Sequence, residues 1–224
     1  MSLKDYLIEN FPGLVLKPSL YFQWDKRIHF EFAKGLHQIK ETSDELNPTY
    51  LQTVYEQALS LFHELFSEND ELFLVLNVYQ YKNYKKRSKR KIKIFQHYIK
   101  NKDVLFHLRH ETLPYAFDDE EDAEEKCTSR FYIQCRKNDI RYSLLIKAIC
   151  HRDFASLKPR LENPYGLYAP DVFFINCTKN IIFFIYDDRG CEVIAKDFET
   201  LRPVYEKYRD WLDESYLQEI DDNF

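Results

Sequence analysis

Two adjacent carboxylates and a guanidinium lie between apolar runs in the last quarter of the chain, in the string Tyr186-Asp187-Asp188-Arg189-Gly190. Carboxylates at a loop tip can bind a divalent metal ion or dock a basic partner protein. Metal-dependent phosphodiesterases gather carboxylates from several segments, and Asp171, which follows Pro170, would supply a third. The nuclease-like pattern beginning at Pro170 is incomplete, because no Glu-x-Lys follows on the next strand. No metal is assigned, and the candidate residues for partner binding or, alternatively, a metal are Asp171, Asp187, Asp188 and Arg189.

The same string also has a structural interpretation, as the turn of a β-hairpin. Apolar residues at 181–186 precede it and the run 191–195 follows it, as in two paired strands. Asp, Asp, Arg and Gly favour a short loop, here a type I turn closed by Gly190 in the left-handed region. On this interpretation the stretch 171–195 holds the central hairpin of a sheet, and Asp187 and Asp188 are turn residues at its tip.

The strongest local charge is a basic run at 82–93, with eight Lys and Arg residues in twelve positions. Tyr81 and Tyr84 could stack on the bases of a nucleic acid bound there. An acidic run at 118–125 holds seven carboxylates in eight residues. The two runs are either solvated loops or near neighbours that neutralise each other. If the basic run instead binds an acidic partner, the candidate residues are Lys85, Lys86, Arg87, Lys89, Arg90 and Lys91.

The common catalytic and cofactor motifs are missing from the sequence. Its four glycines are isolated, so neither a phosphate-binding P-loop nor a dinucleotide fingerprint can be written, and no cofactor is expected. His110-Glu111 begins like a zinc-protease motif, but no second histidine follows four residues later, and His107 would point to the opposite strand face from His110. Cys150 and His151 are sequence neighbours, whereas the fold joins a catalytic pair. No catalytic residue is assigned.

The composition indicates a globular protein with a core rich in aromatic rings. Of the 224 residues, 45% are hydrophobic and 17% aromatic, and the net charge is −5. The five cysteines include no Cys-x-x-Cys pair, which favours free thiols in a reducing cytoplasm. No run approaches the roughly 18–20 apolar residues of a membrane span, and the start lacks a signal-peptide pattern. We therefore expect a cytoplasmic protein that does not enter a membrane.

The elements that must position these residues follow from capping residues and hydrophobic periodicity. Helices are expected over 2–10, from Asn47-Pro48 to about residue 66, from the basic run to near Asn101, and over 139–153 and 198–212. Strands are expected over 21–32, 72–81, 104–115, 129–136 and within 171–195. This order predicts an α+β fold, with a mostly antiparallel sheet of about six strands and helices packed mainly on one face.

The acidic run is the best candidate for an internal boundary, because dense runs of one charge are normally solvated. It would divide the chain into an N-terminal α+β half at 1–116, an acidic linker or loop at 117–127, and a C-terminal α+β half at 128–224 with the central hairpin. One continuous domain is the alternative.

The end of the chain, mainly 172–211, holds several distinctive strings: Phe173-Phe174-Ile175-Asn176, Thr178-Lys179-Asn180, 185–191, Thr200-Leu201-Arg202-Pro203 and 205–211. Through these strings the chain resembles a bacterial family of the Bacillus type whose domain has no established function. Weaker similarity extends upstream through 131–134. The family brings no activity, so the resemblance assigns no catalytic residue.

Two functions of different classes remain. The favoured one is a non-enzymatic, cytoplasmic protein-binding module, of the immunity type that neutralises a partner protein. It is motivated by an α+β chain with clustered charge and no assembled catalytic motif. The alternatives are a metal-dependent phosphodiesterase that uses Asp171, Asp187 and Asp188, and nucleic-acid binding through the basic run.

Overall fold

Seven antiparallel strands form one continuous sheet at the centre of the protein. A computed structural model describes residues 1–41, 43–83, 90–117, 119–163 and 167–216, with the side chains of 90–93 left out. The spatial order is β1-β7-β6-β5-β2-β4-β3. The predicted α+β class with an antiparallel sheet is confirmed, with seven strands instead of six. The strands are β1 (Arg27–Glu31), β2 (Glu71–Tyr81), β3 (Arg109–Pro114), β4 (Lys126–Arg136), β5 (Asp171–Asn176), β6 (Ile181–Ile185) and β7 (Gly190–Ala195).

The long strand β2 joins the two halves of the chain. It pairs with β4 on one side and β5 on the other, and the first strand, β1, pairs with the last, β7. Residues 72–79 of β2 are buried without interruption, as its continuous apolar run predicts for a strand covered on both faces. Residues 1–116 and 128–224 therefore contribute strands to the same sheet.

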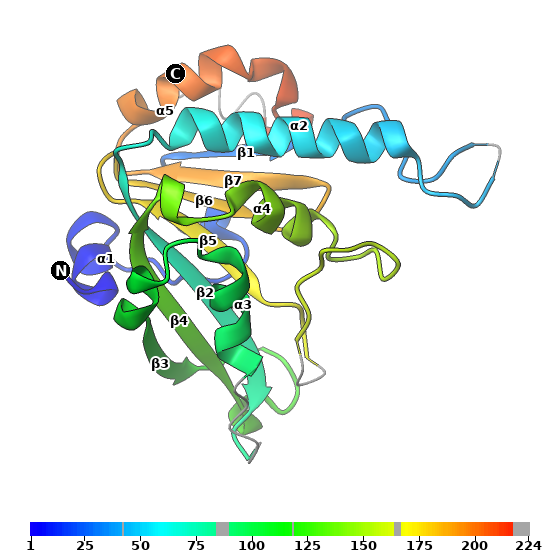
Figure 1. Cartoon of the computed structure of the whole chain (residues 1–224). Helices are drawn as coiled ribbons and strands as arrows, with labels where there is room; N and C mark the ends of the chain where they lie inside the picture. The colour runs from blue at the N-terminus through cyan, green and yellow to red at the C-terminus, as the bar shows by residue number, and fades with distance from the viewer. Residues whose placement is uncertain (42, 84–89, 118, 164–166, 217–224) are drawn as a thin grey trace.

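Four helices cover one face of the sheet (Figure 1). The longest, α2, begins as predicted: Asn47 accepts hydrogen bonds from two N–H groups of the first turn, and Pro48 follows it. Phe62 of α2 stacks on Phe66 and Tyr142 with ring centroids 4.7 and 4.9 Å apart. Among the described residues, no helix has the length and apolarity needed to cross a membrane. The four helices are α2 (Pro48–Leu65), α3 (Arg90–Tyr98), α4 (Tyr142–Cys150) and α5 (Phe198–Lys207).

The opposite face carries α1 (Leu3–Asn10) and the segment 11–24, which includes the 3₁₀ helix η1 (Leu20–Gln23). A second, smaller core lies under them, where Phe173 stacks on Phe184 with ring centroids 4.6 Å apart. The short helix η1 lies against β1 and β7. Of the polar residues on this face, Glu192 of β7 is consequently buried, whereas those of β1 are half-buried.

Two predicted strands differ from the structure at their first halves. Residues 21–32 divide into η1 and β1, and residues 104–115 divide into the 3₁₀ helix η2 (Asp103–His107) and β3. Over only a few residues, the apolar pattern of a short 3₁₀ turn resembles the apolar/polar alternation of a strand, so the sequence does not distinguish the two. His107 therefore does not lie on the same strand as His110.

The helix predicted over 139–153 is shorter, because α4 covers only its centre. Asp139 closes the preceding 3₁₀ turn instead, where its carboxylate accepts a hydrogen bond from the N–H of Arg136 at 2.9 Å. Such local side-chain bonds compete with helix formation. The remaining 3₁₀ turns are η3 (Ala123–Glu125), η4 (Lys137–Asp139), η5 (Arg209–Trp211) and η6 (Glu214–Tyr216).

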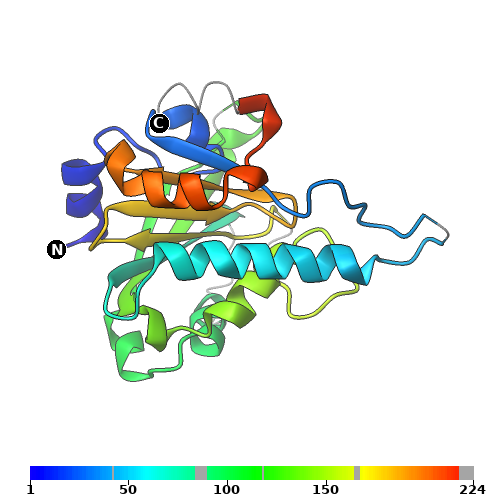
Figure 2. The ribbon, with the colours of Figure 1, turned by 90° about the horizontal axis from the view of Figure 1, so that it is seen from above.

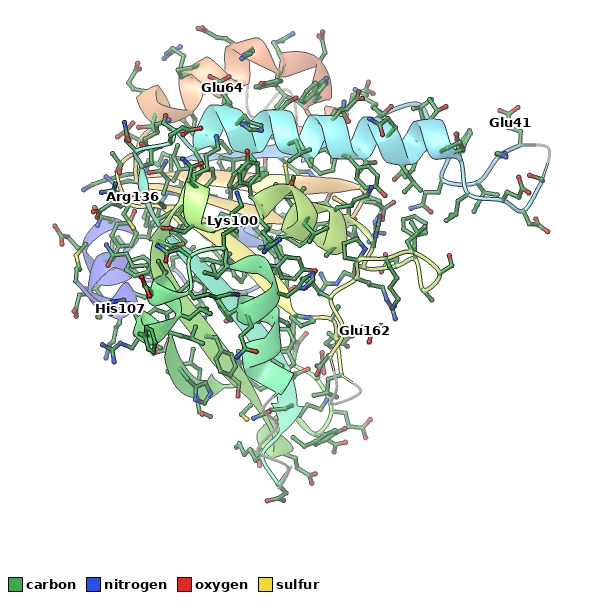
Figure 3. The ribbon with its side chains drawn as sticks, viewed as in Figure 1. Glu41, Glu64, Lys100, His107, Arg136 and Glu162 are labelled. Atoms are coloured by element: carbon green, nitrogen blue, oxygen red, sulfur yellow. The ribbon has the colours of Figure 1, made fainter. Side chains whose placement is uncertain are left out.

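Residues 33–41 and 43–47, which we call the arm, project beyond the N-terminal end of α2 (Figures 1 and 2). The arm connects β1 to α2 and doubles back on itself. Ile39 and Leu46 form an antiparallel bridge, and the N–H of Lys40 donates to the carbonyl of Glu45 at 2.9 Å. Glu41 lies near the far end of the arm (Figure 3). The arm thus places side chains well away from the sheet.

Candidate functional site

The string Tyr186–Gly190 is the turn of the β6–β7 hairpin, in which Ile185 pairs with Cys191. The hairpin interpretation is confirmed, but the proposed role of Gly190 is wrong. Gly190 does not adopt a left-handed conformation; the described glycines with positive φ are Gly13 and Gly35. Instead, a Cβ at Gly190 would overlap the carbonyl oxygen of Phe30 and the hydroxyl of Tyr186. Glycine is needed here because the ring of Tyr186 folds over it.

The two turn carboxylates are buried rather than presented at an exposed tip. Asp187 is 3% exposed and Asp188 is fully buried. Asp187 is saturated by its neighbour: its oxygens accept hydrogen bonds from the Arg189 N–H at 2.8 Å and from the Arg189 guanidinium. The bond to Asp187 raises the pKa of Arg189. This ion pair occupies the carboxylate expected to face a metal or a basic partner.

Asp188 connects three elements. Its Oδ2 accepts hydrogen bonds from the Tyr50 hydroxyl of α2 and from Gln38 Nε2 of the arm, each at 2.7 Å. Its Oδ1 has no hydrogen-bond partner among the described residues. Burial raises the pKa of Asp188, and the two hydrogen bonds oppose that rise. The hairpin turn therefore holds the base of the arm against α2.

Asp171, the third predicted carboxylate, is held by a different set of groups. Arg152, which follows α4, donates to Asp171 Oδ1 at 2.8 Å, and Tyr79 donates to its other oxygen. The same guanidinium donates to the carbonyl oxygens of Ala169 and Tyr186, both at 2.8 Å. Burial raises the pKa of Asp171, whereas Arg152 opposes the rise. Arg152 thereby ties β5 to the hairpin turn.

The three predicted carboxylates therefore have separate partners within the chain. Across the described ranges, no group of three His, Cys, Asp or Glu side chains is placed to hold a metal ion. A metal at Asp187 would have to displace Arg189, and one at Asp171 would have to displace Arg152. The metal-dependent function stays a prediction without a geometric argument in its favour.

Most of the predicted acidic-partner site falls outside the described residues. This applies to Lys85, Lys86, Arg87 and Lys89, while Arg90 and Lys91 belong to α3 but their side chains are not described.

The start of the basic run and the end of the acidic run lie side by side, since the adjoining residues Tyr81 and Lys126 pair where β2 ends and β4 begins. Lys82 donates through its N–H to the carbonyl of Glu125 at 2.8 Å. Lys126 pairs with Glu120 at 3.1 Å.

A cavity of about 260 Å³ lies on the other side of the hairpin, between η1 and strands β1, β6 and β7. The lining residues with polar side-chain groups are Ser19, Tyr21, His29, Tyr186 and Glu192. His29 and Glu192 are directly opposite each other in the β1–β7 pair, so their side chains share one face. None of these five residues was among the predicted site residues.

His29 is the middle member of a hydrogen-bonded chain of three side chains. Its Nδ1 lies 3.0 Å from Asp213 Oδ2, and its Nε2 lies 3.0 Å from the hydroxyl of Tyr186. A carboxylate only accepts, so in the neutral imidazole Nδ1 carries the proton and the Tyr186 hydroxyl donates to Nε2. Burial lowers the pKa of His29, and Asp213 partly offsets this. The Tyr186 oxygen is left with its lone pairs available as acceptors in the cavity.

Glu192 is a carboxylate on a strand that is otherwise apolar or small. It is 6% exposed, and its Oε2 accepts a hydrogen bond from the N–H of Leu20 at 2.8 Å. Among the described ion pairs, none includes Glu192. Burial accordingly raises the pKa of Glu192 to about 7. The sequence contained a signal for Glu192 as a site residue, because it is the one glutamate that interrupts the apolar run 191–195.

The raised pKa of Glu192 predicts a measurable pH dependence. Between the ordinary value near 4.5 and about 7, the folded protein holds a proton that the unfolded chain has lost, so this group destabilises the fold as the pH rises. Buried histidines with lowered pKa values change the stability in the opposite direction as the pH rises. The pH dependence of stability is therefore compared between wild type and Glu192→Gln, whose amide oxygen can still accept a hydrogen bond from the N–H of Leu20. The stability of this variant relative to wild type should increase by about 2 kcal/mol from pH 5 to pH 8, in urea unfolding. A difference that does not change with pH would contradict the assignment.

Comparisons with known proteins extend the similarity over nearly the whole chain. The sequence model described as "Domain of unknown function (DUF3885)" matches residues 3–216. The uncharacterised protein YnaE of Bacillus subtilis strain 168 is 45% identical over 214 residues, which are 96% of this chain and 98% of that protein. No solved structure matches the chain.

Proposed function

The chain belongs to the DUF3885 family, and we propose that it is a cytoplasmic protein-binding module that uses the arm as its contact surface. The observation that carries the proposal is the projection of the arm beyond the N-terminal end of α2 (Figures 1 and 2). The five cysteines are unpaired thiols, which supports a reducing compartment.

The arm exposes apolar side chains in a defined geometry. Leu36 and Ile39 are 38% and 42% exposed. Surface apolar residues occur on most proteins, but here they lie on a projecting segment of about fifteen residues, the form of a finger that enters a partner's groove. A few residues that become fully buried on association supply most of the affinity at protein interfaces.

The base of the arm is held by hydrogen bonds on both of its strands. Ala33 N–H donates to Gln57 of α2 at 2.6 Å, and Gln38 donates to the buried Asp188 at 2.7 Å. Asn47 closes the base: its N–H donates to the carbonyl of Gln38 at 2.8 Å, and its side-chain amide donates to that of His37 at 3.0 Å. An arm already held in place loses less conformational freedom on binding, which favours affinity.

The charges near the end of the arm suggest the chemistry of the partner. Glu41 and Asp44 are acidic, whereas Lys40 is neutralised by Glu45 at 2.6 Å. An apolar groove with a basic rim would complement this surface. An immunity-type protein would use the arm in this way, by filling a groove that its partner needs for its own activity.

Replacing the two exposed apolar arm residues, as Leu36→Ser with Ile39→Ser, should strongly weaken partner binding without unfolding the protein. Both side chains are more than a third exposed, so their loss costs little stability. The measurement is affinity capture from the lysate of the source cells, followed by calorimetry with the purified partner, where a loss of affinity of at least about tenfold is expected.

The matched control is Ile8→Ser with Val15→Ser, which changes two apolar residues that are 61% and 52% exposed but lie away from the arm. It should retain the partner at the wild-type stoichiometry. Equal retention by the arm variant and by the control would rule out the arm as the contact surface, and so would capture of no stoichiometric partner by the wild-type protein.

A further inference from the structure

We propose that the cavity beneath η1 binds a small organic ammonium ion, with the Glu192 carboxylate as its counter-charge and aromatic rings as its walls. This inference goes beyond the proposed function, because the cavity lies on the sheet face opposite α2 and contains no residue of the arm.

The cavity has the volume for a small ligand and walls that suit a cation. Its volume of about 260 Å³ accommodates a short alkyl ammonium but not a nucleotide. Rings of Tyr21, Phe22 and Phe184 line it together with that of Tyr186. The faces of aromatic rings carry negative electrostatic potential and attract ammonium groups within about 6 Å.

Several polar groups of the cavity can accept hydrogen bonds. Glu192 contributes carboxylate oxygen, Ser19 and Tyr21 contribute hydroxyls that can accept as well as donate, and Tyr186 contributes the lone pairs of an oxygen whose proton points to His29. A primary ammonium has three N–H donors and no acceptor, so it matches this set, whereas a phosphate or carboxylate ligand would face repulsion from Glu192. Glu192 is buried beside the cavity, so water no longer stabilises the charge of its carboxylate. A bound cation would stabilise that charge instead.

The charged and titratable groups around Glu192 come from three elements. His29 faces it from β1, with Asp213 behind His29, and Tyr186 faces it from the hairpin. Arg27, on the same face of β1, lies over the ring of Tyr21 with its guanidinium carbon 4.2 Å from the ring centre. The ring of Tyr21, which forms one wall of the cavity, therefore already makes a cation–π contact on the side that faces Arg27.

The test is calorimetric titration of the full chain with n-butylammonium chloride at pH 8, with n-butanol as the uncharged ligand of the same shape and sodium chloride at equal ionic strength. Butylammonium should bind at least about tenfold more tightly than butanol, because only the cation adds a charge–charge interaction with ionised Glu192. At pH 7, titrations in two buffers of different ionisation enthalpy should show release of about half a proton per ligand, since Glu192 titrates near that pH.

Two variants and a matched control assign the binding to the cavity. Glu192→Gln should weaken butylammonium binding at least about tenfold and abolish proton release, whereas Glu9→Gln on the exposed face of α1 should change neither. Phe22→Ala, at a rim position that is 69% exposed, should weaken binding about threefold without loss of folding. Equal affinities for butanol and butylammonium, or wild-type binding by a folded Glu192→Gln variant, would overturn the proposal.

Discussion

Replacing Arg152 by alanine is expected to lower the free energy of unfolding by about 3–5 kcal/mol. Arg152 pairs with Asp171, whose side chain is fully buried, at 2.8 Å. Removing the guanidinium leaves that carboxylate without its counter-charge and leaves the carbonyls of Ala169 and Tyr186 without their donor. The measurement is urea unfolding at pH 7.

The pH dependence of this loss identifies its cause. Burial already raises the pKa of Asp171, and loss of Arg152 would raise it further. As the pH falls, a carboxyl with a raised pKa binds a proton in the folded state before it does so in the unfolded state. The loss in free energy of unfolding should therefore shrink as the pH falls toward 4. Adding Asp171→Asn to the Arg152→Ala variant should recover part of the stability at pH 7, because the buried charge is gone.

Arg202→Ala is the matched control for the same change of residue type. Arg202 forms a pair with Glu199 on the surface of α5, and such exposed pairs contribute about 1 kcal/mol or less. If Arg152→Ala cost no more than this control, Arg152 would not be the residue that compensates the buried Asp171.

The second large effect is expected at Gly190, where alanine should lower the free energy of unfolding by about 3 kcal/mol. A Cβ there would overlap the Phe30 carbonyl of the neighbouring strand and the Tyr186 hydroxyl, and would lie 3.0 Å from Tyr186 Cζ. The β1–β7 pair holds the carbonyl in place, so the strand or the tyrosine ring must shift. The tyrosine cannot shift without losing its hydrogen bond to His29.

Gly35→Ala separates overlap from backbone conformation. Gly35 has a φ of +77° and nothing within 4 Å of an added Cβ, so alanine there should cost only about 1 kcal/mol. Adding Tyr186→Phe to the Gly190→Ala variant removes one of the two oxygens and should recover part of the stability. Equal losses for the Gly190 and Gly35 variants would show that overlap with Phe30 and Tyr186 is not the cause.

Local patterns predicted the elements whose stabilising contacts lie within a few residues. Asn47-Pro48 predicted the start of α2, because capping bonds join a residue to the next turn. The continuous apolar run of β2 predicted burial on both faces, since side-chain alternation leaves no face of such a strand polar. The turn at 186–190 was equally visible in the sequence.

The exposure of the turn carboxylates could not be predicted locally. Acidic residues in a hairpin turn are normally solvated, but Asp188 is buried because Tyr50 of α2, 138 residues earlier in the chain, donates to it. Asp171 is tolerated in the core because Arg152 arrives from the end of α4. The pairing of His29 with Glu192 exists only because β1 crosses to the far edge of the sheet and pairs with β7.

The sequence by itself therefore determined the α+β class, the hairpin with its turn at 186–190 and the capped helix, since each depends on periodicity and on bonds between near neighbours. Only the tertiary structure decided what the string Tyr186–Gly190 is for. Its carboxylates turn inward to hold the arm and the hairpin, and its glycine makes room for a tyrosine ring beside the cavity. The physical reason is that burial and charge compensation depend on side chains brought together across more than a hundred residues, which no local pattern records.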